Sequence, residues 1–340
     1  MHPIDDVRCP KRMTYGPCGG VRADLSCEID SRPCPFAVKN AVVPWSGPAA
    51  PTSHRPTSRL LDALEQGDAG VLTDLTLPPY DAAMVSTLAR ILGGSCDAVL
   101  VGEHQDQPDF PPTLIAQMLV HNGAQPWVTL TCRDRNRIVL EQELAGLALA
   151  GADGVLCVTG DGRAPGIRPD VTQVFDLDGT RLAALAASRG LAVAVPESPA
   201  APPRGRRPER LLQKQRAGAH LAVLNHAGSA REVRAFLAAA VDLGLTIPVL
   251  AAVAIYTDVP SATALSALPG LCLDETRVER VLRAPDPEKA GVESAVEEAL
   301  QLLSLEQVAG VNLSGLASGH GVQHAAEVKA EVGRRIKEQM

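Results

Sequence analysis

The sequence predicts an α/β fold, a closed (β/α)8 TIM barrel with a small cysteine-rich extension at its N-terminus. Two observations lead to this prediction. From about residue 58 onward, short runs of Val, Leu and Ala alternate with longer helical stretches. Four of the eight cysteines lie in the first 34 residues, ahead of a stretch rich in Pro, Ser and Ala. Strands that alternate with helices indicate βαβ units and a parallel sheet, and the length suits a closed barrel.

Strands are expected at 70–77, 98–102, 127–132, 154–159, 192–196, 221–225, 248–253 and 308–313. Helices are expected at 81–92, 112–121, 136–150, 179–188, 207–217, 230–243, 261–268 and 324–338, with an additional helix at 290–303. The alternative is a doubly wound open sheet. No glycine-rich dinucleotide fingerprint follows the first strand, which disfavours that alternative.

We therefore expect three regions: a cysteine-rich metal-binding extension at 1–43, a linker at 44–58, and the barrel at 59–340. The net charge of −7 offers no counterion-release attraction to nucleic acid. No apolar run reaches the roughly 18 residues of a membrane span, and no signal peptide is recognisable at the N-terminus. We expect a cytoplasmic protein. Because that compartment is reducing, the eight cysteines are not expected to form a disulfide framework.

Polar residues follow several of the expected strands. In a barrel of this class the site lies at the carboxyl ends of the strands. The candidates are Asp74, Glu103, Thr131, Arg133, Gly160, Asp161 and Asn225. We expect these side chains to converge on one rim.

Four segments carry a resemblance to a known family. They are TLTCRDRN at 129–136, GVLCVTGD at 154–161, VFDLD at 174–178 and KQRAGAHLAVLN at 214–225. In this order, over about residues 68–335, they resemble the methylenetetrahydrofolate reductase family. That family reduces 5,10-methylenetetrahydrofolate to 5-methyltetrahydrofolate, with hydride passing from NADH or NADPH through bound FAD.

The resemblance implies roles for particular residues. Asp161 would lie near the flavin and the folate, Asp176 would hold the FAD ribose, and Lys214 would bring positive charge to the flavin or its phosphates. Asn225 stands where the family has a folate-contacting Gln and keeps an amide donor and acceptor. The remaining implied contacts are Thr131, Arg133 and Gly160 to the cofactor and Glu103 to the folate.

One position departs from the family pattern. The family motif on the first strand is Glu-x-x-Pro-Pro, with the Glu as general acid, and the alignment on Pro78-Pro79 places Leu75 at the Glu position. Asp74 and Thr76 alternate with Leu75 and Leu77, so the polar pair should face the barrel lumen, because an unpaired Asp under the helices is costly. Asp74 would reach the lumen through a bulge or an altered register. It is either the catalytic acid or a structural carboxylate.

Cys9, Cys18, Cys27 and Cys34 form the N-terminal cluster. The segment resembles the small zinc-binding subunit that partners some anaerobic reductases. Four thiolates suit a structural Zn²⁺ site, which would fold a segment too short for its own core. An iron–sulfur cluster and free thiols are the alternatives.

Three functions remain open at this point. The first is an FAD-dependent NAD(P)H oxidoreductase of one-carbon metabolism. The second is a folate-binding barrel with different chemistry, such as methyl transfer or demethylation, or with reduced activity, because Leu75 replaces the family Glu. The third is a non-catalytic subunit whose cysteine segment docks an electron-transfer protein. A homo-oligomer is compatible with each.

Several other residues have ordinary structural interpretations. Cys132 and Cys157 are expected to be buried core thiols. The basic run Arg204–Arg210 is interpreted as a solvated helix face rather than a phosphate site. His226 is expected to be exposed on a loop.

Overall fold

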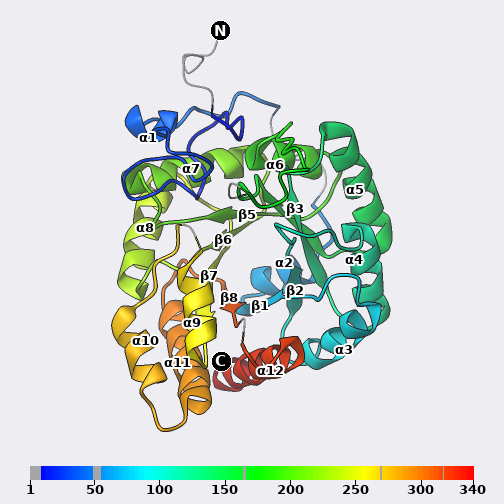
Figure 1. Ribbon diagram of the computed structural model, residues 1–340, viewed down its shortest axis with the longest axis vertical. Helices are drawn as coiled ribbons and strands as arrows, with labels where there is room; N and C mark the ends of the chain where they lie inside the picture. The colour runs from blue at the N-terminus through cyan, green and yellow to red at the C-terminus, as the bar shows by residue number, and fades with distance from the viewer. Residues whose placement is uncertain (1–8, 49–54, 164–165, 269, 317) are drawn as a thin grey trace.

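The computed structural model describes residues 9–48, 55–163, 166–268, 270–316 and 318–340. Its strands form one closed barrel in the order β1 to β8, and every neighbouring pair is parallel (Figure 1). The strands are β1 Gly70–Leu75, β2 Ala98–Val101, β3 Pro126–Thr131, β4 Gly154–Val158, β5 Val193–Glu197, β6 Leu221–Leu224, β7 Val249–Ile255 and β8 Gly310–Gly315. The predicted barrel is confirmed, and each strand begins within two residues of its expected start.

Helices surround the barrel on the outside (Figure 1). They are α3 Ala82–Leu92, α4 Pro112–His121, α5 Arg137–Ala150, α6 Gly179–Ser188, α7 Arg207–Arg216, α8 Ala230–Asp242, α9 Val259–Ser266, α11 Pro287–Leu303 and α12 Val322–Gln339. Three helices were not expected: α1 Pro35–Val38, α2 Arg59–Glu65 and α10 Glu275–Leu282. Within the described part of the chain, no helix is both long and apolar enough to cross a lipid bilayer.

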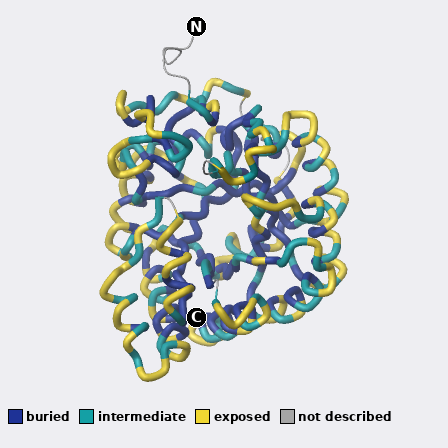
Figure 2. Tube along the Cα trace, in the orientation of Figure 1, coloured by how far each residue is buried: buried dark blue, intermediate teal, exposed yellow. Residues whose placement is uncertain are grey.

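The core has an inner and an outer layer. Leu72, Leu100, Trp127 and Leu156 pack inside the barrel, whereas the alternate strand residues pack against the helices. The two layers follow from the period of two along a strand. Figure 2 shows the strands as a buried ring inside helices whose outer faces are exposed.

Helix α2 closes the amino-terminal end of the barrel. Its Leu60 and Leu61 join the apolar cluster inside the barrel. Asp153, just before β4, holds the helix: its carboxylate accepts hydrogen bonds from Ser58 Oγ at 2.9 Å, Arg59 N at 2.7 Å and Trp127 Nε1 at 2.8 Å. The opposite, carboxyl end therefore stays available for a site.

The cysteine segment lies at that opposite end, beside β5, α6 and α7 (Figure 1). Phe36 packs with Met13, Val21 and Cys34 in a small apolar cluster of its own. Barrel side chains bind the backbone of the segment and attach it to the barrel. Arg207, fully buried on α7, donates to Pro17 O at 3.3 Å and Cys18 O at 2.9 Å. Asp178 Oδ2 accepts a hydrogen bond from Thr14 N at 2.8 Å, and Gln213 Oε1 accepts one from Trp45 N at 2.7 Å. The segment is thus part of the rim of the barrel.

Candidate functional site

A cavity of about 340 Å³ opens at the carboxyl ends of the strands. It brings together all but one of the barrel residues predicted to form the site: Asp74, Glu103, Thr131, Arg133, Gly160, Asp161, Lys214 and Asn225 line it. The cysteine segment supplies another part of its wall, through Lys11, Met13, Pro17, Cys18 and Gly19. A volume of this size is typical of small-molecule sites.

Asp74 faces the lumen, as expected, but without a bulge. The pairing of β1 with β2 runs unbroken, with Leu72 opposite Ala98 and Asp74 opposite Leu100. Asp74 therefore shares its face with the inner-layer Leu72, and Leu75 packs outward against the helices. Asn312 Nδ2 donates to Asp74 Oδ1 at 2.9 Å. Thr76 does not share this face, because β1 has ended before it and its side chain is exposed.

A buried group of charges forms the β5–β6 side of the cavity. Glu197 accepts hydrogen bonds from Lys214 Nζ at 2.9 Å and Arg207 Nη1 at 3.4 Å. Burial raises the pKa of Glu197, but the charges of Lys214, Arg207 and Arg210 outweigh burial and the pKa is lowered. Burial lowers the pKa of Lys214 to about 8, with Arg210 and Arg207 acting in the same direction. This side of the cavity carries more basic than acidic groups, because Lys214, Arg207 and Arg210 lie near the two carboxylates of Glu197 and Asp178.

Arg210 is the unpaired member of this group. It is 2% exposed and lines the cavity, yet its Nε and Nη1 have no hydrogen-bond partner among the described residues. Buried guanidinium donors left unsatisfied cost free energy, so the arrangement favours an anionic ligand. The expectation of a solvated helix face at Arg204–Arg210 is wrong for Arg207 and Arg210, which face inward from α7.

Gly160 and Asp161 follow β4 on the opposite wall. Gly160 has a φ of +91°, and a Cβ there would meet Arg133 Cβ at 3.1 Å and Thr131 Cβ at 3.2 Å. Lys11 Nζ, from the cysteine segment, donates to Gly160 O at 2.6 Å and forms an ion pair with Glu28. Burial lowers the pKa of Lys11, but Cys18, Glu28 and Asp161 outweigh it and the pKa is raised. Lys11 is therefore a fixed cation beside Asp161.

Asn225, at the end of β6, donates through Nδ2 to Ser198 Oγ at 2.8 Å. Its Oδ1 has no partner among the described residues and is available to a ligand. The next residue corrects an expectation. His226 is buried rather than exposed, and neither ring nitrogen has a partner in the described chain. Burial lowers its pKa to about 4, so the imidazole is neutral at pH 7.

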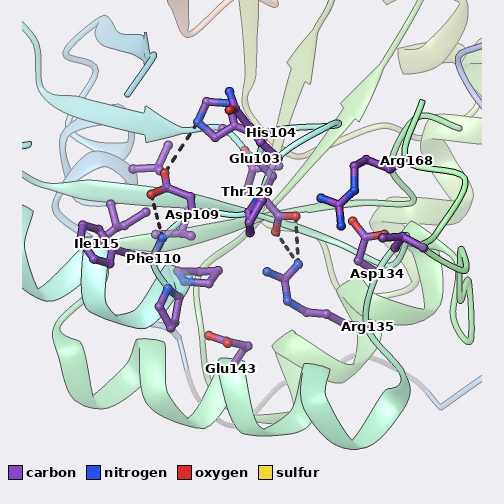
Figure 3. Close-up of a pocket in the computed structure, with 18 of the residues that line it drawn as sticks. Glu103, His104, Asp109, Phe110, Ile115, Thr129, Asp134, Arg135, Glu143 and Arg168 are labelled. Atoms are coloured by element: carbon purple, nitrogen blue, oxygen red, sulfur yellow. Dashed lines mark hydrogen bonds and ion pairs between the residues drawn. The ribbon is translucent and has the colours of Figure 1, made fainter. Parts of the chain in front are cut away.

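Glu103 separates this cavity from a second one of about 400 Å³, and Glu103 and Thr129 line both. Arg135 Nη1 contacts the two carboxylate oxygens of Glu103 at 2.8 and 2.9 Å (Figure 3). Thr131 Oγ1 donates to Glu103 Oε2 at 2.7 Å. Glu103 is thus held by β3 and Arg135. Cationic and acidic side chains alternate around the second cavity, where Arg163 also pairs with Asp134 at 2.7 Å.

Arg133 and Asp176 lie differently from the other predicted cofactor contacts. Arg133 lines the first cavity but is engaged, since it donates to Asp134 Oδ2 at 2.9 Å and His104 O at 2.7 Å. Asp176 lines neither cavity. It is on the surface, where its Oδ2 accepts a hydrogen bond from Arg137 N at 3.0 Å. The structure does not bring Asp176 together with the other candidates.

The four N-terminal cysteines line one small cavity within their segment. Cys18 Sγ lies 3.4 Å from Glu28 Oε1, to which it donates, and Cys34 packs in the apolar cluster with Phe36. Within the described ranges, no three His, Cys, Asp or Glu side chains are arranged to hold a metal ion. The donor set suits zinc and is gathered at one place, but the thiols do not surround a common point. As expected, Cys132 and Cys157 are buried in the core.

Comparisons with known proteins address the family and the fold. A sequence profile described as "Methylene-tetrahydrofolate reductase C terminal" matches residues 4–43, which is the cysteine segment. The segment is thus similar to a part of that family. No curated protein sequence matches the chain.

Two solved structures are similar to the chain to different degrees. An uncharacterized protein from Clostridium thermocellum, which binds two copies of 5-methyl-5,6,7,8-tetrahydrofolic acid, has a TM-score of 0.62 at 12% identity, over 83% of this chain and all of that one. That similarity establishes a shared fold. Tryptophan synthase from M. tuberculosis in its aminoacrylate-bound form follows, with a TM-score of 0.48 and 14% identity over 82% of this chain and 100% of that chain, which is too distant to bear on function.

Sequence reasoning missed Lys11, Arg210 and Asn312 at the site, and Lys329, which lies behind the site on the outer side of β1. Arg210 had a detectable signal, because it lies four residues before Lys214 and therefore on the same face of a helix. The other three had none, because each reaches the site from an element distant in sequence.

Proposed function

We propose that the protein is a flavoenzyme of the methylenetetrahydrofolate reductase type, which reduces 5,10-methylenetetrahydrofolate to 5-methyltetrahydrofolate. One observation carries the proposal: a single cavity has cationic groups on one side, at Lys214 and at Arg210 with its unsatisfied donors, and carboxylate and amide groups, at Asp74, Asp161 and Asn225, elsewhere on its walls. The cationic side suits the phosphates of a dinucleotide. The carboxylates and amide suit the donor and acceptor edge of a pterin.

FAD fits the residues present. Arg210 has donors without partners, and the second cavity extends the space beyond Glu103. Arg210 and Lys214 would hold its phosphates, and Asp161 would lie near its ring. When bound, FAD would supply hydride transfer from NADH or NADPH to the folate. The chain's own contribution would be to bind and orient these groups at the carboxyl ends of the strands.

Asp74 would act on the folate. Asn312 occupies Oδ1, and Oδ2 has no partner among the described residues. A carboxyl group placed in this way can transfer or stabilise a proton at a folate nitrogen. Asp74→Asn should therefore lower folate turnover at least about tenfold while folate binding changes less. Asp68→Asn, in the exposed loop before β1, is the matched control. Unchanged turnover in the Asp74 variant would remove Asp74 from the mechanism.

The first experiment is an absorption spectrum of the purified protein before and after incubation with FAD. A flavin band that bleaches with NADH or NADPH and returns on addition of 5,10-methylenetetrahydrofolate is the expected result. A colourless protein that cannot be loaded with FAD would contradict the reductase.

The second candidate is a folate-binding barrel with other one-carbon chemistry. Leu75, at the place of the family Glu, favours it, and so does the fold shared with a protein that binds 5-methyl-5,6,7,8-tetrahydrofolic acid. This candidate predicts binding of 5-methyltetrahydrofolate in calorimetry by protein that takes up no FAD.

We also propose that the cysteine cavity holds zinc. The support is the presence of all four thiols at one cavity and that none of the four forms a disulfide within the described residues. Metal analysis should give about one zinc per chain, released by a thiol reagent. Iron with a visible charge-transfer band would indicate the cluster instead, and metal-free, folded protein with reactive thiols would contradict both.

A further inference from the structure

Lys329 is a buried cation behind the candidate catalytic carboxylate. It lies on α12 with 3% of its surface exposed, and its Nζ donates to the backbone carbonyl of Asp74 at 2.6 Å. That is its one hydrogen bond within the described chain. The side chain lines a small gap between β1 and the surrounding helices, next to Leu88, Leu92, Ala325 and Ala326. An ammonium group in apolar surroundings is costly, and an apolar side chain could fill this space.

Asp74 lies just beyond the last backbone pair between β1 and β8. The ladder between β1 and β8 ends at the pair Thr73 and Leu313, one residue before Asp74. Beyond that pair, two side chains provide the contacts: Asn312 of β8 reaches the Asp74 carboxylate, and Lys329 of α12 reaches its carbonyl. The two contacts reach the same residue from inside and from outside the barrel.

We propose that Lys329 is a positioning residue for Asp74, which fixes the end of β1 through the Asp74 carbonyl and places a buried positive charge behind the strand that carries the Asp74 carboxylate. Asn312 then occupies Oδ1 and leaves Oδ2 to the folate. This inference rests on the proposed function, because it assumes that Asp74 acts on the ligand. The negative charge of Asp74 counteracts the burial that lowers the pKa of Lys329, so the two charges interact across the strand.

The test is a double-mutant cycle in the full-length, FAD-loaded protein. Lys329→Met should lower kcat about tenfold or more with a smaller change in KM, because the carboxylate is displaced from the reacting atom. In an Asp74→Asn background the same change should cost less than about threefold, because the group on which Lys329 acts is gone. Additive losses, or a wild-type kcat in Lys329→Met, would overturn the inference.

Two further variants separate positioning from general damage. Lys337→Met removes another lysine of the same helix, which pairs with Asp97 at 2.6 Å. Because this pair does not involve Asp74, the change should leave kcat unchanged. Lys329→Gln keeps a hydrogen-bond donor without the charge and serves if the Met variant does not fold. An intermediate kcat supports the inference, and a kcat equal to that of the wild type overturns the role of the charge. The thermal unfolding midpoint of every variant is measured in parallel.

Calorimetry with 5-methyltetrahydrofolate separates the two levels of failure. If the wild type neither binds this folate nor turns over, the proposed function fails and the inference fails with it. If the wild type binds the folate without turnover, the dissociation constant for 5-methyltetrahydrofolate replaces kcat as the quantity compared in the double-mutant cycle. If the wild type is active and the cycle is additive, only the role of Lys329 fails.

Discussion

At the scale of single residues, unpaired polar atoms locate the ligand side of the cavity. The Arg210 guanidinium is buried with donors unsatisfied, while its neighbours Arg207 and Lys214 share Glu197. A folded chain seldom leaves such donors without a partner. We therefore expect Arg210 to favour the binding of an anion while lowering the stability of the ligand-free fold.

Arg210→Met should weaken FAD binding at least about tenfold, because a charge-assisted hydrogen bond to phosphate is lost. The same change should leave the free energy of unfolding equal or slightly higher, because a buried guanidinium with unsatisfied hydrogen-bond donors is removed. Quenching of flavin fluorescence gives the affinity, and thermal unfolding gives the stability. Arg206→Met, at a side chain 42% exposed, is the control. Equal FAD affinity in wild type and Arg210→Met would contradict the assignment.

Lys214 gives the binding of an anion a pH dependence. Its pKa is lowered to about 8, chiefly by burial, so the side chain is protonated below that pH and neutral above it. Affinity for an anionic ligand should therefore fall as pH rises from about 7 to 9. Titration of the dissociation constant checks this, and Lys214→Met should abolish the dependence along with part of the affinity.

At the scale of elements, α2 shows how a short helix that lacks the expected pattern becomes part of the core. Residues 44–58 were expected to form a linker, yet Ser58 caps α2 and donates to Asp153. The long helices and all strands were predictable because apolar periodicity is strong over each of them. The seven-residue α2 was not, because its structure depends on a carboxylate 93 or more positions away from the groups that it binds.

Asp153→Ala should lower the free energy of unfolding by about 3 kcal/mol, because the buried donors of Ser58 and Trp127 lose their acceptor. Chemical denaturation measures the loss. Asp62→Ala, at a half-exposed position on the same helix, should change stability by less than about 0.5 kcal/mol. A small effect of the Asp153 change would show that apolar packing alone holds α2.

At the scale of the whole molecule, the site draws on both ends of the chain. Lys11 comes from the cysteine segment and Lys329 from the last helix. Strand-end residues such as Asp161 and Asn225 could be predicted, because a barrel gathers successive strand ends on one rim. Long-range partners could not, because sequence patterns carry no signal for which distant side chain completes a hydrogen bond.

A buried acid makes stability depend on pH. Glu298, on α11, accepts Ala254 N at 3.2 Å, and burial raises its pKa to about 7 from an ordinary 4.5. The folded state therefore keeps a proton that the unfolded chain loses between pH 4.5 and 7. The contribution of Glu298 to stability falls across that window, by about 1.4 kcal/mol per unit of pKa difference, and is lost in full above pH 7.

Glu298→Gln should consequently raise the thermal unfolding midpoint at pH 8 relative to the wild type, and the difference should shrink toward pH 5. Unfolding curves at matched ionic strength over this range provide the comparison. Glu297→Gln, at the neighbouring side chain that is 46% exposed, is the control. A difference between wild type and Glu298→Gln that does not vary with pH would show that Glu298 titrates normally.

The hydrogen bond between Asn312 and Asp74 joins positions 238 residues apart. During synthesis β1 emerges early, and one of its edges stays unpaired until β8 leaves the ribosome. Asp74 gains both of its tethers only from the final stretch of the chain, so an incomplete polypeptide has no finished cavity. A ligand of this cavity accordingly meets a barrel in which β8 has already been made, and it cannot serve as a template for the earlier strands.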